Sequence, residues 1–551
     1  MQQNVGQSKS DEEPEANMEH QSQKDIPVTQ EEGKTHAVAV DEDTKHAAYN
    51  LHKKVISYSA VARRLHNMKT KTAQDMEDET EPGHGLRQPQ HHSQQSCEGN
   101  LCDKKTDPDL KRCDEHSSLL WLRNRALSSP QPAAHQIGQI TIYPEKVLGH
   151  GGFGVVCEGK FGGRQVAVKR VPYFLTRVDR EAELHIKCDS HENVLRIQFI
   201  EKDKFTRDTY IVLELCQGTL IDYVQGTLVV NEKQPQDLLK DATKGLIHLH
   251  KLGIVHRDIK PSNILITRPS TGIIRAVIGD FGVSKSLGDG QESFSVSISG
   301  TQRWMAPELF CGEQRATLHV DVYALGLTIT YVLTGKLPFD GYSGFELMAR
   351  IKNGDCALIQ QMSNVKARSL IESMTSHDAR HRPPTSCLLV HPFFWENKKE
   401  LRFIELVSDH LPCAPKVHAI LRHSKDITLG SSKADWGKMA SNWPGFAPVV
   451  IYLQNPQPAT QALAKYDFTS VASLLRAIRN LSHHLHELPR EIQDVFGDKA
   501  PKTLVSDLFL KIFPRLLVGT WSLVGREVGH EPGFQEFYHE WWVNDGWWAQ
   551  S

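Results

Sequence analysis

Apolar positions are distributed unevenly along the chain. Residues 1–136 are rich in Gln, Glu, Lys, His, Ser and Asp and poor in aromatic side chains. Such a segment cannot bury enough apolar surface to offset the entropy lost on folding, so we predict a disordered polar tail over 1–136. Within it, residues 51–69 have the pattern of a basic amphipathic helix, which is either a transient helix of the tail or a docking motif.

Two folded segments are predicted after the tail. Over residues 137–395 the pattern predicts strands first and helices afterwards, which is typical of an α+β domain with a β-rich N-terminal lobe and a helical C-terminal lobe. Residues 396–551 form a second globular block. No linker composition separates the two blocks, and neither contains an internal repeat.

Composition narrows the function classes only slightly. The 64 Lys and Arg residues nearly balance the 66 Asp and Glu residues, so the net charge of −2 provides no global attraction to nucleic acid. Any nucleic-acid site must therefore be a local basic patch. The ten cysteines are scattered rather than arranged as a disulfide framework, which indicates a reducing compartment.

The sequence has no targeting or membrane signal that we recognise. The first residues contain neither a basic nor an apolar signal-peptide region, and no apolar run reaches about 18 residues. We therefore expect no membrane span and a cytoplasmic protein. Association with the endoplasmic reticulum stays open.

A glycine-rich turn opens the first folded segment. The sequence LGHGGFGVV has the spacing G-x-G-x-x-G-x-V, with the key positions at Gly149, Gly151, Gly154 and Val156. Glycines allow backbone amides to approach phosphates closely, although dinucleotide-binding folds and ordinary turns share this spacing.

A lysine and an acidic residue follow the turn at informative positions. VAVK ends at Lys169, on a strand from which the ammonium can reach the α- and β-phosphates of a nucleotide. The next segment, DREAELHI, is predicted to be a helix that supplies a carboxylate partner for Lys169. We favour Glu181 for this role, with Glu183 as the alternative.

The sequence HRDIKPSN carries the strongest chemical signal. Asp258 is expected to accept the proton of a substrate hydroxyl, and Asn263 to hold a magnesium ion. Lys260, two positions after the aspartate, is the choice typical of serine/threonine-specific transfer. Asp280 of the following DFG motif is expected to bind the Mg²⁺ that bridges the phosphates of ATP.

The motifs occur in one order and at one set of spacings. After DFG comes APE, which ends at Glu308, and we expect Arg382 to pair with this carboxylate. Any single motif could be a turn or a surface ion pair, but together they resemble a eukaryotic protein kinase over the whole segment, with no catalytic position missing. Four serines between DFG and APE are candidate phosphorylation sites. They are Ser293, Ser295, Ser297 and Ser299.

The second block carries a further resemblance. HPFFW runs directly into F-I-x-x-V-S-D, and three later segments, DWGKMASNW, YDFTSVASLLRAIRNLSHHLHELP and LFLKIFPRLLVGTW, have related counterparts in the dual kinase/endoribonucleases. That family comprises the inositol-requiring enzyme of the unfolded protein response and ribonuclease L. The resemblance covers residues 137–551 and implies an all-helical kinase-extension nuclease (KEN) domain over 396–551.

The segment VASLLRAIRNLSHHL is predicted to be an amphipathic helix. Its core face has apolar residues at helical spacing. These are Val471, Leu474, Leu475, Ile478 and Leu481. The other face presents Arg476, Arg479, Asn480, His483 and His484. Asn480 and His484 are four residues apart and hence share one face.

The resemblance also implies a metal-independent chemistry for this helix. RNA can be cleaved if the 2′-hydroxyl loses its proton and an acid protonates the leaving 5′-oxygen, and histidine suits proton transfer near neutral pH. In the family Tyr, Asn and His act together and yield a 2′,3′-cyclic phosphate. The matching residues are Tyr466, which would contact or help to deprotonate the nucleophile, Asn480, which would hold the phosphate, and His484, the general acid.

Two features of the block leave questions open. Enzymes of the unfolded protein response have two lysines after the Asn, where this chain has Leu481 and Ser482, the form closer to ribonuclease L. We expect this to remove two phosphate contacts, for which nearby arginines could compensate. The C-terminal tryptophans either pack on the nuclease helices or stack on RNA bases. They are Trp541, Trp542, Trp547 and Trp548.

The sequence therefore predicts a serine/threonine protein kinase fused to an endoribonuclease. The resemblance implies that ATP or ADP with Mg²⁺ binds the kinase, that a homodimer forms, and that trans-autophosphorylation or another protein substrate accompanies RNA cleavage. One alternative is an active kinase whose C-terminal module serves only as a dimerisation scaffold. Another is a nucleotide-sensing pseudokinase that drives RNA cleavage alone. The activating signal, the RNA sequence preference and the choice between unfolded-protein and antiviral-type pathways are not visible.

Overall fold

The computed structural model describes residues 134–151, 154–173, 178–188, 190–269, 272–287, 294–295, 302–310, 315–455, 466–497 and 501–544. Residues 1–133 of the predicted tail lie outside this range, as do Ser293, Ser297 and Ser299 and the tryptophans at 547 and 548. The first strand begins at His135, two residues before the predicted start of the first folded domain.

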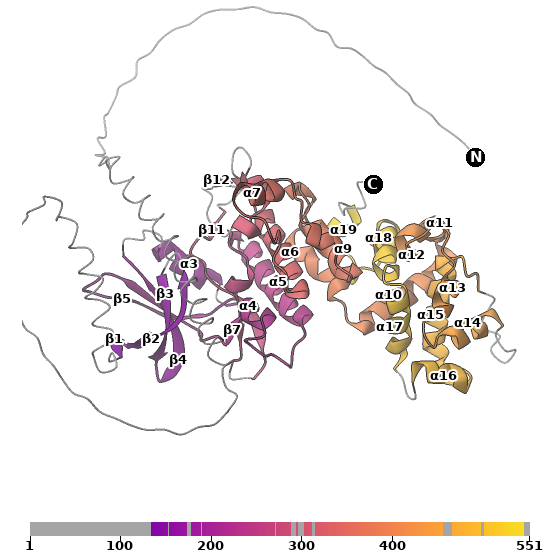
Figure 1. The fold of residues 1–551 in the computed structure, drawn as a ribbon, viewed down its shortest axis with the longest axis horizontal. Coiled ribbons are helices and arrows are strands. Elements are labelled where there is room, and N and C mark those ends of the chain that lie inside the picture. Colours follow the sequence, from indigo (N-terminus) through magenta and orange to yellow (C-terminus); the bar gives the residue numbers. More distant parts are fainter. Residues whose placement is uncertain are drawn as a thin grey trace, which may run out of the picture. The chain divides into compact units, whose positions relative to one another are not determined.

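A six-stranded antiparallel sheet forms the N-terminal lobe, in the order β1-β2-β3-β4-β6-β5. The strands are β1 (His135–Ile137), β2 (Ile140–Gly151), β3 (Gly154–Phe161), β4 (Arg164–Val171), β5 (Ile197–Lys202) and β6 (Thr209–Leu213). Strand β4 buries both faces, because Val166 and Val168 enter one apolar cluster while Ala167 enters another. Helix α3 (Val178–Cys188) completes the lobe (Figure 1).

The C-terminal lobe is mainly helical. Its helices are α4 (Leu220–Val224), α5 (Pro235–Lys251), α6 (His319–Thr334), α7 (Gly344–Lys352), α8 (Ala357–Gln360) and α9 (Val365–Met374). Its short strands are β7 (Gly218–Thr219), β8 (Ile254–Val255), β9 (Ile264–Thr267), β10 (Arg275–Ile278), β11 (Lys285–Ser286), β12 (Phe294–Ser295) and β13 (Arg315–Ala316). Helix α6 is apolar nearly all round and is buried accordingly.

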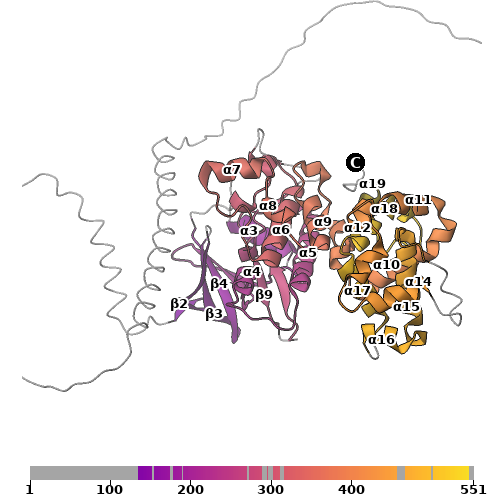
Figure 2. The same cartoon turned by 45° about the vertical axis from the view of Figure 1, so that its right-hand side comes forward.

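The described residues after 396 form only helices, so the predicted fold class, an α+β domain followed by an all-α domain, is confirmed. The helices are α10 (Asn397–His410), α11 (Pro415–His423), α12 (Lys425–Leu429), α13 (Trp436–Ser441), α14 (Ala447–Gln454), α15 (Val471–His484), α16 (Arg490–Phe496), α17 (Lys502–Ile512), α18 (Leu516–Val528) and α19 (Glu540–Asn544). Helices α10, α15 and α17 lie side by side in Figures 1 and 2 and contact one another.

Aromatic side chains join the two-lobed domain to this helical domain. The imidazole of His391 contacts the rings of Trp521 and Trp542, with centroids 4.9 and 5.4 Å away. The indole nitrogen of Trp542 donates to the carbonyl of Cys387 at 2.7 Å. Trp542 therefore packs against both domains, which goes further than the predicted packing on the helical domain alone.

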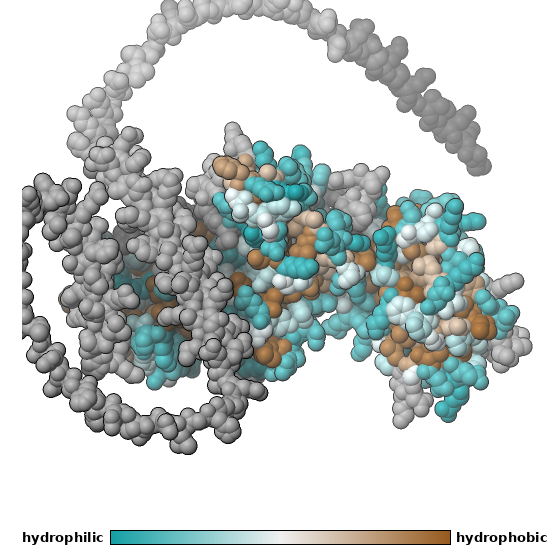
Figure 3. All heavy atoms as spheres, viewed as in Figure 1, coloured by the Kyte–Doolittle hydropathy of each residue, from teal (hydrophilic) through white to brown (hydrophobic). Residues whose placement is uncertain are grey.

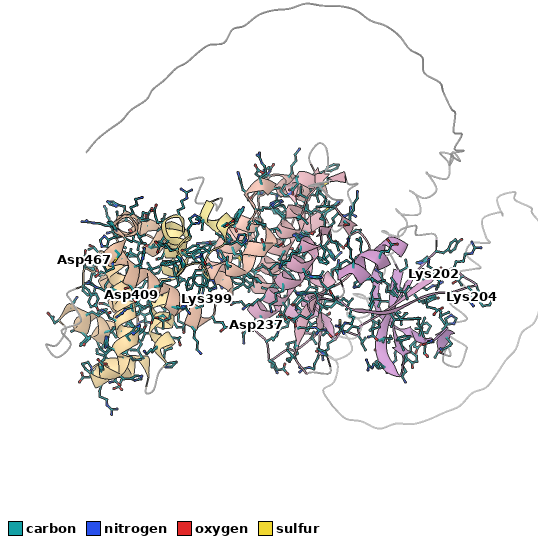
Figure 4. The ribbon with its side chains drawn as sticks, turned by 180° about the vertical axis from the view of Figure 1, so that it is seen from behind. Lys202, Lys204, Asp237, Lys399, Asp409 and Asp467 are labelled. Atoms are coloured by element: carbon teal, nitrogen blue, oxygen red, sulfur yellow. The ribbon has the colours of Figure 1, made fainter. Side chains whose placement is uncertain are left out.

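An ion pair also crosses the junction between the domains. Lys366 of α9 lies 2.5 Å from the buried carboxylate of Glu400 in α10. Within the helical domain, the side chain of Lys399, which is labelled in Figure 4, donates to the backbone carbonyl of Glu536. One apolar cluster also extends through both domains, so the C-terminal lobe and the helical domain share a packed core.

The described helices include none that is long and apolar enough on its own to cross a membrane. Helices α17 and α18 satisfy the length and composition only when taken together, and they are bent by 95° relative to each other. Many of their apolar side chains are buried in the helical domain.

The face in Figure 3 shows hydrophilic residues over much of its area, with smaller hydrophobic areas between them.

Candidate active sites

The glycine-rich turn lies between β2 and β3. At Gly154 φ is 150°, and a Cβ atom there would lie 2.0 Å from the carbonyl oxygen of Arg170, so the position requires glycine. In the part of the chain that the structure describes, nothing beyond its chain neighbours lies within 4 Å of the Cβ position of Gly149, so its backbone can be approached closely. Gly151 ends β2, and Val156 pairs in register with Lys169 of β4.

Lys169 lies 2.8 Å from the carboxylate of Asp280, so the sheet and the DFG segment meet at this pair. Burial alone would raise the pKa of Asp280, but the Lys169 ammonium outweighs it and the pKa is lowered. The carboxylate is therefore ionised near neutral pH, as a metal ligand must be. The side chain of Glu181, the predicted partner of Lys169, lies outside the described residues, and Glu183 is exposed.

The residue after Asp280 docks the DFG segment on α3. Phe281 stacks on His185 of α3 with centroids 4.4 Å apart and meets the edge of His256 at 5.2 Å. Burial lowers the pKa of His185 to about 4, so this contact involves a neutral imidazole. Asp280 itself has φ of 62°, an unfavourable value for a non-glycine residue that the surrounding contacts maintain.

The catalytic-loop residues predicted from HRDIKPSN converge on one carboxylate. The ammonium of Lys260 lies 2.6 Å from Asp258, and the side-chain amide of Asn263 donates to the same carboxylate oxygen at 2.9 Å. The backbone amide of Gly279 donates to the carbonyl of Asn263 at 2.9 Å, which places Asn263 next to the residue that precedes Asp280. The side-chain nitrogen of Asn263 donates to Asp258, so its amide oxygen and the Asp280 carboxylate are the kind of ligands that a divalent, oxygen-preferring cation requires.

Asp321 is a functional residue that sequence analysis missed. This fully buried side chain of α6 accepts hydrogen bonds from the backbone amides of His256 and Arg257, each at 2.7 Å. It thereby fixes the loop that carries Asp258. The only signal available in the sequence was an acidic residue within an otherwise apolar helix.

The predicted pair that closes the activation segment is confirmed. Arg382 donates to both carboxylate oxygens of Glu308, at 2.7 and 2.8 Å, and its side chain is fully buried. This bidentate geometry is the strongest that arginine offers, so it fixes the end of the segment. Backbone pairing of β12 with β13 places Ser295, one of the four candidate phosphorylation sites, opposite Arg315.

A second constellation lies on α15 of the helical domain. The predicted core face is confirmed, because all five of its apolar side chains are fully buried. Ser470 caps the helix by accepting from the amide of Ser473. The indole of Trp436 donates to the carbonyls of Asp467 and Ser470, so α13 holds the segment that leads from Tyr466 into α15.

Tyr466 and Asn480 are brought together across this segment. The side-chain amide of Asn480 donates to the Tyr466 hydroxyl oxygen at 3.0 Å. Arg476 lies over the tyrosine ring, 5.2 Å from its centroid. Burial raises the pKa of Tyr466, so its hydroxyl is protonated near neutral pH.

The two adjacent histidines at the end of α15 have different partners. The Nδ1 atom of His484 lies 2.9 Å from the carboxylate of Glu487, and the Nε2 atom of His483 lies 3.0 Å from Glu405 of α10. Both side chains are about one-third exposed, at 34% and 38%. His483 is thus directed toward α10, whereas His484 is held by the turn that follows α15.

The positions that differ from the lysine-containing relatives face inward. Leu481 and Ser482 are both fully buried, so neither side chain could contact a phosphate directly. Arg479 lies on the outer face, where it is 3.0 Å from Asp409 of α10 and 3.3 Å from the oxygen of Asn480. Asp409 and Asp467 both lie in the helical domain in Figure 4. Asp409 is a further partner that sequence analysis did not assign.

Comparison with known proteins matches both domains. The family described as Protein kinase domain matches residues 143–394, and the family described as Ribonuclease 2-5A matches residues 400–538. The two matches follow each other in the order that the motifs indicated. The exact domain limits, 1–136, 137–395 and 396–551, stay predictions.

Curated relatives combine the same two families. The chain is 36% identical over 445 residues to the human serine/threonine-protein kinase/endoribonuclease IRE2, covering 77% of this chain and 46% of the relative. It is 34% identical to serine/threonine-protein kinase/endoribonuclease ire-1 of Caenorhabditis elegans, covering 76% and 42%. It is 30% identical to the sensor for unfolded proteins in the ER ire1 of Schizosaccharomyces pombe, covering 79% and 42%. The chain thus spans less than half the length of these relatives.

Proposed function

This chain belongs to the family of dual protein kinase/endoribonucleases, and on that premise we propose that it transfers phosphate to serine or threonine and cleaves RNA without a metal ion. The observation that carries the proposal is the coexistence of two groups of matching residues. In the first domain Lys169 pairs with Asp280, and Lys260 pairs with Asp258. Tyr466 and Asn480 meet beside the helix that ends at His484 in the second.

In the kinase domain, each side chain has a distinct task. A protein kinase domain implies binding of ATP and a divalent metal, for which we propose Mg²⁺ held by Asn263 and Asp280. When bound, the metal neutralises negative charge on the phosphates. Lys169 contacts the α- and β-phosphates, and Asp258 accepts the proton of the attacking hydroxyl. The phosphate acceptor is a second copy's activation segment or another protein.

In the nuclease domain, we propose a proton-transfer mechanism. The 2′-oxygen attacks phosphorus while the bond to the 5′-oxygen breaks, giving a 2′,3′-cyclic phosphate and a 5′-hydroxyl end. The 2′-hydroxyl proton passes to solvent, Tyr466 and Asn480 contact the reacting phosphodiester, and His484 donates a proton to the 5′-oxygen. The raised pKa of Tyr466 supports a contact role for this residue.

We propose that a homodimer couples the kinase domain to the nuclease domain. Binding of nucleotide to the kinase domain favours this homodimer. We expect ADP with Mg²⁺ to stimulate RNA cleavage although it transfers no phosphate. A ligand at 100 times its Kd that binds only the dimer-competent state stabilises that state by about 2.7 kcal/mol. Cleavage rate and sedimentation, measured over a range of protein concentrations with and without ADP, test this expectation.

The matched control is Asp258→Asn, which removes the proton acceptor but keeps the nucleotide-binding residues. This variant should lose phosphotransfer and still respond to ADP. A chain that remains monomeric at saturating nucleotide and nevertheless cuts RNA would contradict the dimer proposal.

The cytoplasmic location expected from the sequence stays a prediction, which fractionation of cells can check.

A further inference from the structure

The turn after α15 brings a carboxylate to one side of His484. Glu487 ends the short 3₁₀ helix Leu485–Glu487, and its Oε2 atom is 2.9 Å from Nδ1 of His484. The two nitrogens of an imidazole lie on opposite sides of the ring. With Nδ1 facing Glu487, Nε2 is therefore the nitrogen that can meet a substrate.

The fold holds this turn in place. Leu485 and Leu488, on either side of Glu487, are both buried. Gln493 of α16 donates to the carbonyls of His486 and Leu488, at 3.3 and 2.6 Å. Glu487 itself is 67% exposed, so packing does not require its carboxylate. The backbone thus positions a side chain that contributes little to the core.

We propose that Glu487 is a positioning residue for RNA cleavage, holding His484 with Nδ1–H toward the carboxylate and Nε2–H toward the leaving 5′-oxygen. The proposal rests on the proposed function, in which His484 is the general acid. As the phosphorus–5′-oxygen bond breaks, the Nε2 proton moves to that oxygen and the imidazole becomes neutral. The Nδ1–H remains hydrogen-bonded to Glu487, so the ring orientation is kept through the step.

The neighbouring histidine provides a matched comparison. His483 also pairs with a carboxylate, but through Nε2 and to Glu405 on α10. The distance of 3.0 Å and the exposure of His483 are close to those of His484, whereas Glu405 is less exposed than Glu487, at 24% against 67%. A general effect of removing a histidine–carboxylate pair should therefore be at least as large in Glu405→Gln as in Glu487→Gln. A positioning effect on the acid should appear only in Glu487→Gln.

We expect Glu487→Gln to lower kcat for RNA cleavage about tenfold with KM nearly unchanged, since orientation of the acid matters in the transition state. Glu405→Gln should cleave at the wild-type rate. The decisive substrate carries sulfur in place of the scissile 5′-oxygen, because a thiolate departs without protonation. On that substrate Glu487→Gln and His484→Ala should both match the wild type.

Each other outcome has a definite meaning. A Glu487→Gln variant as fast as wild type on ordinary RNA, while His484→Ala is slow and is rescued by the sulfur substrate, overturns the positioning role alone. A Glu487→Gln variant that is slow on both substrates also overturns it, because the defect then does not concern the proton. A His484→Ala variant that sulfur fails to rescue overturns the general-acid assignment and the proposal with it. Thermal unfolding of each variant confirms that it is folded.

Discussion

Replacement of His484 by alanine is expected to slow RNA cleavage by about 10²–10⁴-fold, which is the usual contribution of a general acid. RNA binding should be nearly unchanged, because the proton is needed in the transition state and not in the ground state. Single-turnover cleavage of a stem-loop RNA gives the rate. Fluorescence anisotropy with the same RNA gives the Kd.

The adjacent histidine is the control for this variant. His483→Ala should lose much less activity, because the next residue of a helix points about 100° away and His483 pairs with Glu405 of α10. Equal losses at His483 and His484 would show that the wrong side chain, or the wrong chemistry, has been assigned to α15. Full activity of His484→Ala would contradict the general-acid assignment, and absence of RNA cleavage by the wild-type protein would favour the scaffold alternative for the second domain.

Asp280→Ala is expected to abolish autophosphorylation. The substitution removes the proposed metal ligand and the partner of Lys169, which lies 2.8 Å from the Asp280 carboxylate. Since phosphoryl transfer depends almost entirely on positioning and charge stabilisation, no other group replaces both contacts. Incorporation of ³²P from labelled ATP, followed over time, measures the effect.

Asp355→Ala is a suitable control, because Asp355 forms an exposed ion pair with Arg350 far along the chain from the catalytic loop. It should incorporate phosphate at the wild-type rate. Phosphate incorporation by Asp280→Ala would contradict the role of this carboxylate. A wild-type chain that incorporates none would support the pseudokinase alternative instead.

Much of both sites was predictable because the relevant information is local. The glycines, Asp258, Asn263 and Asp280 stand in short motifs at characteristic spacings, and the core face of α15 follows the 3.6-residue period. The same period placed Leu481 on the core face, and the structure agrees. The expectation that Leu481 and Ser482 remove two phosphate contacts stays a prediction.

Long-range partners were not predictable from local pattern. Trp542 donates to Cys387, which is 155 residues earlier, and this choice depends on how two domains pack. Asp321 and Asp409 are ordinary acidic residues in sequence. Only the folded chain brings the first to the amides of the catalytic loop and the second to Arg479. Polar partner choice depends on tertiary structure, because several donors of equal strength compete for each carboxylate.

The central claim is that this kinase-linked helical domain cleaves RNA by side-chain proton transfer. The most direct test is to incubate wild-type protein, with its dimer held by a chemical cross-link, with stem-loop RNA in EDTA and to identify the new ends by mass spectrometry. The account predicts that cleavage persists and gives 2′,3′-cyclic phosphate and 5′-hydroxyl ends. Products with 5′-phosphate ends, or loss of cleavage in EDTA while the dimer remains intact, would contradict it.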